Sequence, residues 1–180
     1  DYSKKKNKSI HLIGLLSDGG VHSHISHLEE LLLILNQNSC KKVYLHLFTD
    51  GRDVDPKSGI KYVKNLELFL KKTTGKIVSI IGRYYSMDRD LNFDRTRKAY
   101  NLIVNGIGKK TNNFKKEIEL SYNKNVTDEF LEPLSIGEKS YLIEEGDVVI
   151  SFNFRSDRMR QITRMLSQRD FSYDGSKPLN

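Results

Sequence analysis

The stretch VYLHLFTDGRD at residues 43–53 decides how this chain folds. Its first six residues are mostly large and apolar, which is typical of a buried β-strand. Its last four, Asp50-Gly51-Arg52-Asp53, form a turn, because a helical pattern begins near Lys57. A strand that passes through a turn into a helix is the repeating unit of α/β proteins.

The charges in this turn allow two interpretations. An arginine between two aspartates can be a self-neutralising ion cluster in a solvated turn. Alternatively, Arg52 is a fixed cation and Asp53 is a carboxylate that exchanges protons with a small molecule. The turn alone does not decide between the two.

Three further segments have the pattern of a strand followed by a turn and a helix. The strands are expected at residues 9–16, 77–81 and 147–152, in addition to 43–48. The helices are expected at residues 24–35, 57–72, 94–105 and 156–167. The polar connection at 109–127 contains one short helical pattern near 114–122, and residues 141–143 form a candidate edge strand. This order predicts an α/β fold, a three-layer α/β/α sandwich around a largely parallel or mixed sheet.

Composition limits the kind of protein. The 180 residues are enough for one domain with a sizeable core. The net charge of +7 and the pI of about 9.3 favour anionic partners, either nucleic acid or phosphorylated and carboxylated small molecules. Residues 1–8 are basic and residues 172–180 lack a structural pattern, so both are expected to be linkers or tails.

The sequence also bears on location in the cell. No apolar run approaches the length of a membrane span, and the apolar stretch after residue 8 is a strand rather than a signal peptide. The single cysteine, Cys40, cannot form an internal disulfide and fits a reducing compartment. We therefore expect a cytoplasmic protein that does not contact a membrane.

Polar side chains follow each of the predicted strands. Because ligands of parallel α/β sheets bind beyond the carboxyl ends of the strands, these side chains are expected to converge. They are His22, Arg52, Asp53, Arg83, Arg89, Arg155 and Arg158. Helix N-termini add partial positive charge at the same edge. The pattern predicts a cationic pocket for a small, doubly anionic ligand such as a phosphorylated acid.

Other polar residues near the turns are expected to have structural roles. His22, His24 and His27 are spaced closely enough to suggest a metal site, but no cysteine or convergent carboxylate accompanies them. No metal site is therefore predicted in this chain, and His24 and His27 are expected to be structural. Three aspartates are expected to orient arginines or to cap helices, namely Asp18, Asp50 and Asp88.

The same turns carry a resemblance to a known family. They contain the strings LLSDGGVHSH at 15–24, TDGRDV at 49–54, GRYYSMDRD at 82–90, DEF at 128–130 and FNFRSDR at 152–158. These strings resemble the cofactor-independent (2,3-bisphosphoglycerate-independent) phosphoglycerate mutases, and the resemblance covers nearly the whole chain.

The resemblance implies an enzyme of two domains with different roles. Members of this family have a phosphatase-like domain, which holds two divalent metals (manganese, or magnesium) and a serine that takes the phosphoryl group. They also have a transferase domain that grips the substrate, and this chain resembles only that domain. Residues 1–180 are thus expected to be one substrate-binding domain excised from a larger two-domain enzyme. The fragment would bind no cofactor itself and would be inactive alone.

The resemblance also implies roles for the site residues. The whole enzyme would interconvert 3-phosphoglycerate and 2-phosphoglycerate in glycolysis and gluconeogenesis. His22 and the arginines named above would bind substrate. Asp53 would contact the glycerate hydroxyls and act as catalytic acid and base. The expected partners are the two phosphoglycerates and the phosphatase-like domain, with no nucleic acid.

Two alternatives stay open from the sequence. A basic nucleic-acid-binding module is supported by the net positive charge. A non-catalytic sensor of phosphorylated ligands is the third hypothesis.

Overall fold

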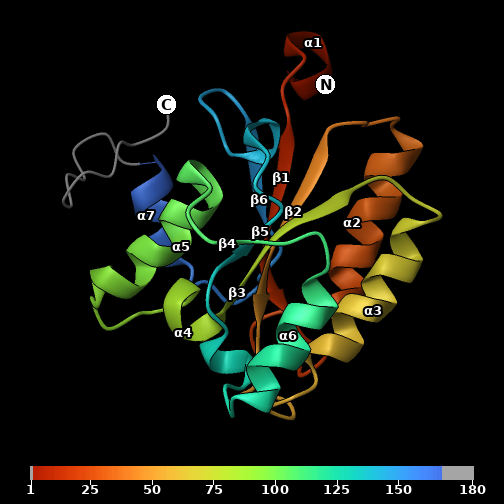
Figure 1. Ribbon diagram of the computed structural model, residues 1–180. Coiled ribbons are helices and arrows are strands. Elements are labelled where there is room, and N and C mark those ends of the chain that lie inside the picture. The colour runs from red at the N-terminus through yellow and green to blue at the C-terminus, as the bar shows by residue number, and fades with distance from the viewer. Residues whose placement is uncertain (1, 168–180) are drawn as a thin grey trace.

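The computed structural model describes residues 2–167 of the chain (Figure 1). It contains a six-stranded sheet in which the four long expected strands appear within a few residues of their predicted bounds. The strands are β1 (Ile10–Leu16), β2 (Val43–Thr49), β3 (Lys76–Gly82), β4 (Lys109–Lys110), β5 (Leu134–Ser135) and β6 (Val148–Ser151). The two-residue strands β4 and β5 were not predicted, because so short a segment has no periodicity to detect.

The strand order is β4-β5-β3-β2-β1-β6. Strands β1, β2, β3 and β6 run parallel to one another, whereas β5 pairs antiparallel with β3. The sheet is thus largely parallel and mixed, as expected. The chain moves outward from β1 to β3 and then returns to the other side of β1 with β6. The crevice between the loops that follow β1 and β6 is therefore the place where ligands of such sheets bind.

Helices cover both faces of the sheet, which confirms the three-layer α/β/α sandwich. They are α1 (Tyr2–Lys6), α2 (Ile25–Gln37), α3 (Gly59–Leu70), α4 (Arg83–Ser86), α5 (Phe93–Asn105), α6 (Phe114–Asn123) and α7 (Arg160–Ser167), with 3₁₀ turns η1 (Asp128–Phe130) and η2 (Lys139–Tyr141). In Figure 1, α2, α3 and α6 lie on one side of the sheet, and α4, α5 and α7 lie on the other. Each side has its own apolar cluster, for example Leu28 and Leu66 on the first and Phe48 and Ile162 on the second.

Two segments differ from what the sequence predicted. Residues 141–143 do not form an edge strand. Tyr141 ends η2, and the amide of Ile143 donates to the carbonyl of Ile103 in α5 at 3.0 Å instead of to a strand. In the basic segment 1–8, residues 2–6 form α1, while the predicted tail at 172–180 lies outside the described residues.

A row of buried polar side chains crosses the sheet at the amino-terminal half of its strands. Ser79 of β3 lies 2.7 Å from His46 Nδ1, and His46 Nε2 lies 2.9 Å from His11 Nδ1. The row ends where His11 Nε2 approaches Asp147 Oδ2 at 3.2 Å. Burial lowers the pKa of His11 despite the nearby Asp147, and burial together with His11 holds the pKa of His46 far below its ordinary value.

The turn η1 packs against glycines at the ends of β2 and β3. A Cβ atom on Gly82 would lie 2.3 Å from the carbonyl oxygen of Glu129, and one on Gly51 would lie 2.8 Å from the amide nitrogen of the same residue. A Cβ atom on Gly59 would lie 2.4 Å from a carboxylate oxygen of Asp128. Glycine at these positions therefore lets η1 approach the edge of the sheet where the charged turns lie.

No helix within residues 2–167 is long and apolar enough to cross a membrane.

Candidate functional site

The turn after β2 is built around Asp50. This carboxylate is 1% exposed, and its Oδ1 accepts from the backbone amides of Arg52 at 3.1 Å and Asp53 at 3.0 Å. Its Oδ2 accepts from the Ser17 hydroxyl at 2.6 Å. Burial alone would raise the pKa of Asp50, but these hydrogen bonds and Arg83 outweigh it and hold the pKa below its ordinary value. Asp50 thus supports the turn, as the sequence predicted.

Arg83 joins the turn after β2 to the strand β3. It is the first residue of α4, and its side chain is only 3% exposed. Its Nη1 donates to Asp50 Oδ1 at 2.7 Å and to Asp53 Oδ2 at 2.5 Å. Burial opposes its charge, but the hydrogen bonds to the two aspartates raise the pKa of Arg83 above its ordinary value. The guanidinium therefore stays charged inside the protein and fixes the Asp53 carboxylate.

His22, in the loop after β1, lies between two carboxylates. Its Nε2 is 3.9 Å from Asp53 Oδ2, and its Nδ1 is 3.7 Å from Asp157 Oδ1. Burial and the charge of Arg83 lower the pKa of His22 more than Asp53 and Asp157 raise it. The imidazole is therefore neutral near pH 7. Its Nδ1 is buried without a hydrogen-bond partner among the described residues.

The loop after β6 brings two more arginines to the same place. Arg155 pairs with Asp157 through Nε at 2.9 Å and Nη2 at 3.2 Å, and Arg89 reaches the same carboxylate through Nη1 at 2.8 Å. Arg158 Nη1 donates to the carbonyl of Met87 at 3.1 Å. Its Nε is buried and has no hydrogen-bond partner within residues 2–167.

The pKa of Arg158 shows how closely the cations gather. Burial lowers it first, and the charges of Arg89, Arg83 and Arg52 lower it further. Arginines that follow β2, β3 and β6 therefore act on one another through space. A concentration of like charge of this kind is stabilised by an anionic ligand.

Arg52 is the most exposed of the predicted site residues. Its side chain is 58% exposed, and its Nη1 contacts Glu129 Oε1 at 3.3 Å. Glu129 belongs to η1, so the packing of that turn against Gly82 and Gly51 sets where this contact occurs. Arg52 thus lies at the solvent side of the group, while Arg83 lies at its base.

All the residues that the sequence placed at the site lie at the carboxyl edge of the sheet. They come from the loops after β1, β2, β3 and β6, and contacts or charge interactions link them. Sequence reasoning missed Glu129 and Asp157 as members of this group. The only signal was their position inside the strings DEF and FNFRSDR, which said nothing of their contacts. Of the supporting aspartates, Asp88 contacts Arg95 at 3.2 Å, whereas Asp18 accepts from the Tyr62 hydroxyl and meets no arginine within the described residues.

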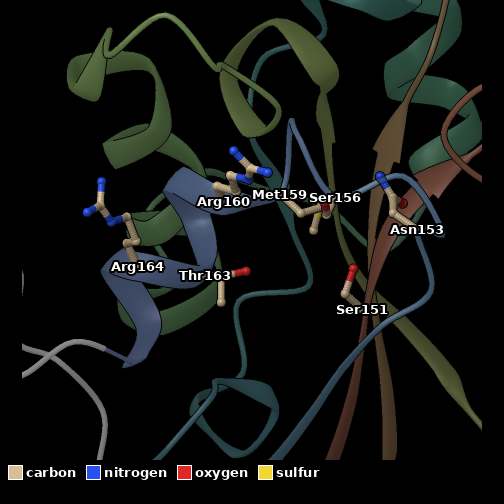
Figure 2. A pocket seen from close by; sticks show the side chains of 7 residues that line it. All are labelled: Ser151, Asn153, Ser156, Met159, Arg160, Thr163 and Arg164. Atoms are coloured by element: carbon tan, nitrogen blue, oxygen red, sulfur yellow. The ribbon is translucent and has the colours of Figure 1, made fainter.

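A separate cavity of ≈ 630 Å³ lies between β6 and α7. Figure 2 shows Ser151 of β6 and Thr163 of α7 on its opposite sides, with the Arg160 and Arg164 side chains directed away from Ser151. None of the predicted site residues lines this cavity. The candidate site is therefore the charged edge.

No metal centre is present in the part of the chain that the structure describes. Residues 2–167 contain no group of three or more histidine, cysteine, aspartate or glutamate side chains placed to hold a metal ion. The donor set at the charged edge is dominated by arginine, which repels metal cations. That any metal belongs to another part of a longer protein stays a prediction.

The fold and the edge together define a class of protein: an α/β domain that gathers arginines, a neutral histidine and partly exposed aspartates at the carboxyl edge of its sheet. The chain belongs to the family described as the BPG-independent PGAM N-terminus, whose model matches residues 1–178. The resemblance noted in the sequence is thereby confirmed.

Individual relatives agree with this membership. The chain is 51% identical to a 2,3-bisphosphoglycerate-independent phosphoglycerate mutase of Flavobacterium johnsoniae over 99% of its own length and 36% of the relative. It is 47% identical to the mutase of the same name from Clostridium tetani, over 95% of its own length and 34% of that protein. The solved structure of Leishmania mexicana phosphoglycerate mutase superposes with a TM-score of 0.91 at 30% identity, covering 98% of this chain and 35% of that one. The chain thus spans about a third of the length of the relatives it matches.

Proposed function

We propose that this chain is the substrate-binding domain of a phosphoglycerate mutase, and that residues 1–180 form one domain of a longer two-domain enzyme. One observation supports the proposal most strongly. Side chains from four separate loops meet at the edge of the sheet where ligands of α/β proteins bind, and they supply several arginines beside the partly exposed carboxylate of Asp53. The ligands would be 3-phosphoglycerate and 2-phosphoglycerate.

The arginines suit the charged groups of such a ligand. Carboxylate and phosphate each present pairs of oxygen acceptors that the guanidinium fork binds with two parallel hydrogen bonds. His22, Arg52, Arg83, Arg89, Arg155 and Arg158 would hold these groups. Within the described residues, Arg155 Nη1 and Arg158 Nε donate no hydrogen bond, so donors remain for a ligand.

Asp53 would be the catalytic residue of this domain. Arg83 fixes its Oδ2, whereas its Oδ1 has no hydrogen-bond partner within residues 2–167. A glycerate hydroxyl must lose a proton when it accepts a phosphoryl group and regain one when it gives the group up. A carboxylate held by one oxygen and open at the other can accept and return that proton, as general acid–base catalysis requires.

The phosphoryl carrier would lie outside this chain. The expected phosphatase-like part of the protein would supply a serine, and two divalent metals there, manganese or magnesium, would stabilise the charge of the phosphoryl group. The contribution of this domain is to keep the glycerate in place between two transfers. A reaction of this kind would operate in glycolysis and gluconeogenesis in the cytoplasm.

Titration calorimetry on the chain tests the binding role. We expect 3-phosphoglycerate to bind and an oligonucleotide to bind weakly, with a steep loss of any oligonucleotide signal as salt increases. Arg155→Ala should weaken phosphoglycerate binding. Binding of the oligonucleotide with none of phosphoglycerate would favour the nucleic-acid hypothesis, for which the net charge is the supporting observation.

Kinetics of the full-length protein test the catalytic role. Asp53→Asn should lower kcat while KM changes little, because the amide keeps the shape of the side chain but cannot take a proton. A comparable loss in both parameters would argue against the acid–base role. Binding without any turnover by the wild-type full-length protein would favour the sensor hypothesis.

A further inference from the structure

The carboxylate of Asp157 is the point at which three site residues meet. Its Oδ2 contacts Arg89 Nη1 at 2.8 Å and Arg155 Nη2 at 3.2 Å, and its Oδ1 contacts Arg155 Nε at 2.9 Å. His22 Nδ1 lies 3.7 Å from the same Oδ1. The three partners come from the loops after β1, β3 and β6, so a single side chain connects three separate loops.

Asp157 differs from the other aspartates of these loops in what it binds. Asp50 accepts from the backbone amides of its own turn, and Asp88 accepts from the amides of Asp90 and Asn92. Those carboxylates therefore build local structure. Within the described residues, the carboxylate of Asp157 contacts only the side chains of Arg89, Arg155 and His22. It neither caps a helix nor closes a turn.

The pairing leaves the arginines free to bind something else. Arg155 uses Nε and Nη2, so Nη1 remains, and Arg89 uses Nη1, so Nε and Nη2 remain. These remaining groups donate no hydrogen bond within residues 2–167. Without the carboxylate, two mobile cations would repel each other. With it, both are held at one point, although their side chains are 44% and 47% exposed.

A carboxylate at an anion site also has an unfavourable effect, because it repels the ligand. Solvent weakens this repulsion, since the Asp157 side chain is 28% exposed. Solvent does not reduce the entropic cost of ordering long side chains when a ligand binds. We propose that Asp157 is the positioning residue of this site, which holds Arg89 and Arg155 convergent beside His22 before the ligand arrives. The inference rests on the proposed function, because it assumes that the arginines bind a phosphorylated acid.

The test is Asp157→Asn in the 180-residue chain, with 3-phosphoglycerate and inorganic phosphate as separate probes in calorimetry. The amide has nearly the same shape but cannot serve two guanidinium groups. We expect the affinity for 3-phosphoglycerate to fall roughly tenfold, the factor that corresponds to ordering two long side chains on binding. The matched control is Asp94→Asn, which alters an aspartate–arginine pair with Arg97 on the surface of α5 and should leave the affinity unchanged.

A second measurement detects the geometry without a ligand. In an NMR titration, the pKa of His22 should move further down in Asp157→Asn, because the negative charge of Asp157 raises it in the wild type. A residue that merely stabilised the fold would lower the melting temperature and leave this pKa in place.

The outcomes separate the two claims. If the wild type binds neither probe, the proposed function fails and the inference fails with it. If the wild type binds 3-phosphoglycerate and Asp157→Asn binds it equally well, the inference alone is wrong. Tighter binding by Asp157→Asn would show that Asp157 competes with the ligand instead of positioning its partners, and this also overturns the inference.

Discussion

At the scale of single residues, Arg83 and Arg52 have the same side chain in opposite environments. Arg83 is buried between Asp50 and Asp53, whereas the side chain of Arg52 extends toward solvent and pairs with Glu129. A buried charge must be compensated where it lies, because removing one partner leaves the other unpaired in the protein interior. An exposed ion pair contributes little, since water solvates both groups.

We therefore predict that Arg83→Met strongly destabilises the fold. The change leaves Asp50, which is 1% exposed, without its cation, and the free energy of unfolding should fall by about 3–5 kcal/mol. Urea denaturation at pH 7 measures this. Arg52→Met is the control and should change the same quantity by less than about 1 kcal/mol. Similar losses in both variants would mean that burial of Arg83 does not set its importance.

The sequence predicted much of the site at this scale but not its pairing. Strand periodicity placed His22, Arg52, Arg83 and Arg155 at one edge of the sheet, and the resemblance named the residues that are proposed to bind substrate. The contacts of Asp157 and Glu129 were not predictable. Which carboxylate meets which arginine depends on the conformations of four loops that are far apart in the chain.

At the scale of elements, the long strands and helices were predictable because their apolar residues repeat with a clear period. The short elements were not. The turn η1 has no periodicity, and its place beside the sheet depends on the absence of side chains at Gly51, Gly59 and Gly82. The candidate strand at 141–143 was wrong because three apolar residues in a row are equally consistent with a buried loop, and Ile143 is buried against α5 and α7.

The packing of η1 predicts a specific effect of a single methyl group. In Gly82→Ala, the new Cβ would lie 2.3 Å from the Glu129 carbonyl oxygen and 2.6 Å from the Leu131 amide nitrogen, so η1 must move. We expect a loss of about 1–3 kcal/mol in the free energy of unfolding, and weaker ligand binding because Glu129 no longer meets Arg52.

Gly20→Ala provides the comparison for this variant. Gly20 has a φ of +68°, and no atom lies within 4 Å of the position that a Cβ atom would take there. Alanine at this position therefore meets only backbone strain, about 1 kcal/mol. Denaturation of both variants and calorimetry with 3-phosphoglycerate give the comparison. Full ligand affinity in Gly82→Ala would contradict the link between η1 and the site.

The polar row across the sheet predicts how stability depends on pH. The pKa values of His11 and His46 are lowered in the fold, so below about pH 6.5 the unfolded chain binds protons that the folded chain does not. The free energy of unfolding should therefore fall as the pH decreases from 6.5, by up to about 1.4 kcal/mol per pH unit for each histidine that stays neutral.

One group opposes this trend. Burial raises the pKa of Asp128 to about 6, above its ordinary 3.8, so its protonation adds stability as the pH falls from about 6 toward 4. Urea denaturation at intervals between pH 7 and 5 of the wild type and His46→Asn isolates the histidine contribution. The slope should be smaller in His46→Asn, and equal slopes would show that His46 takes up its proton in the fold as readily as in the unfolded chain.

At the scale of the whole molecule, the chain matches only one segment of its longer relatives. It spans about a third of their length, and residues 2–167 hold no group of side chains placed for a metal. The arginines concentrate at one edge, whereas many lysines lie in the exposed surface segments such as 109–124. The net charge of +7 thus combines a cluster of arginines at the proposed anion site with an ordinary solvated surface.

We predict that the 180-residue chain alone binds phosphoglycerate but does not convert it. The carrier of the phosphoryl group is expected elsewhere, so a chain that only holds the glycerate cannot move the group between hydroxyls. Formation of 2-phosphoglycerate from 3-phosphoglycerate, assayed with and without manganese, checks this. Robust manganese-dependent turnover by the chain alone would contradict it.

The position of β1 in the sheet has a consequence for how the protein is made. Strand β1 pairs on one side with β2, which follows it closely, and on the other with β6, which begins at Val148. During synthesis on the ribosome, β1, β2 and β3 can associate early. One edge of β1 stays unpaired until β6 has been made. An unpaired edge strand is a template for association with other chains. We therefore expect nascent chains that stop before residue 148 to aggregate, and the proposed anion site to form only after Arg158 has left the ribosome.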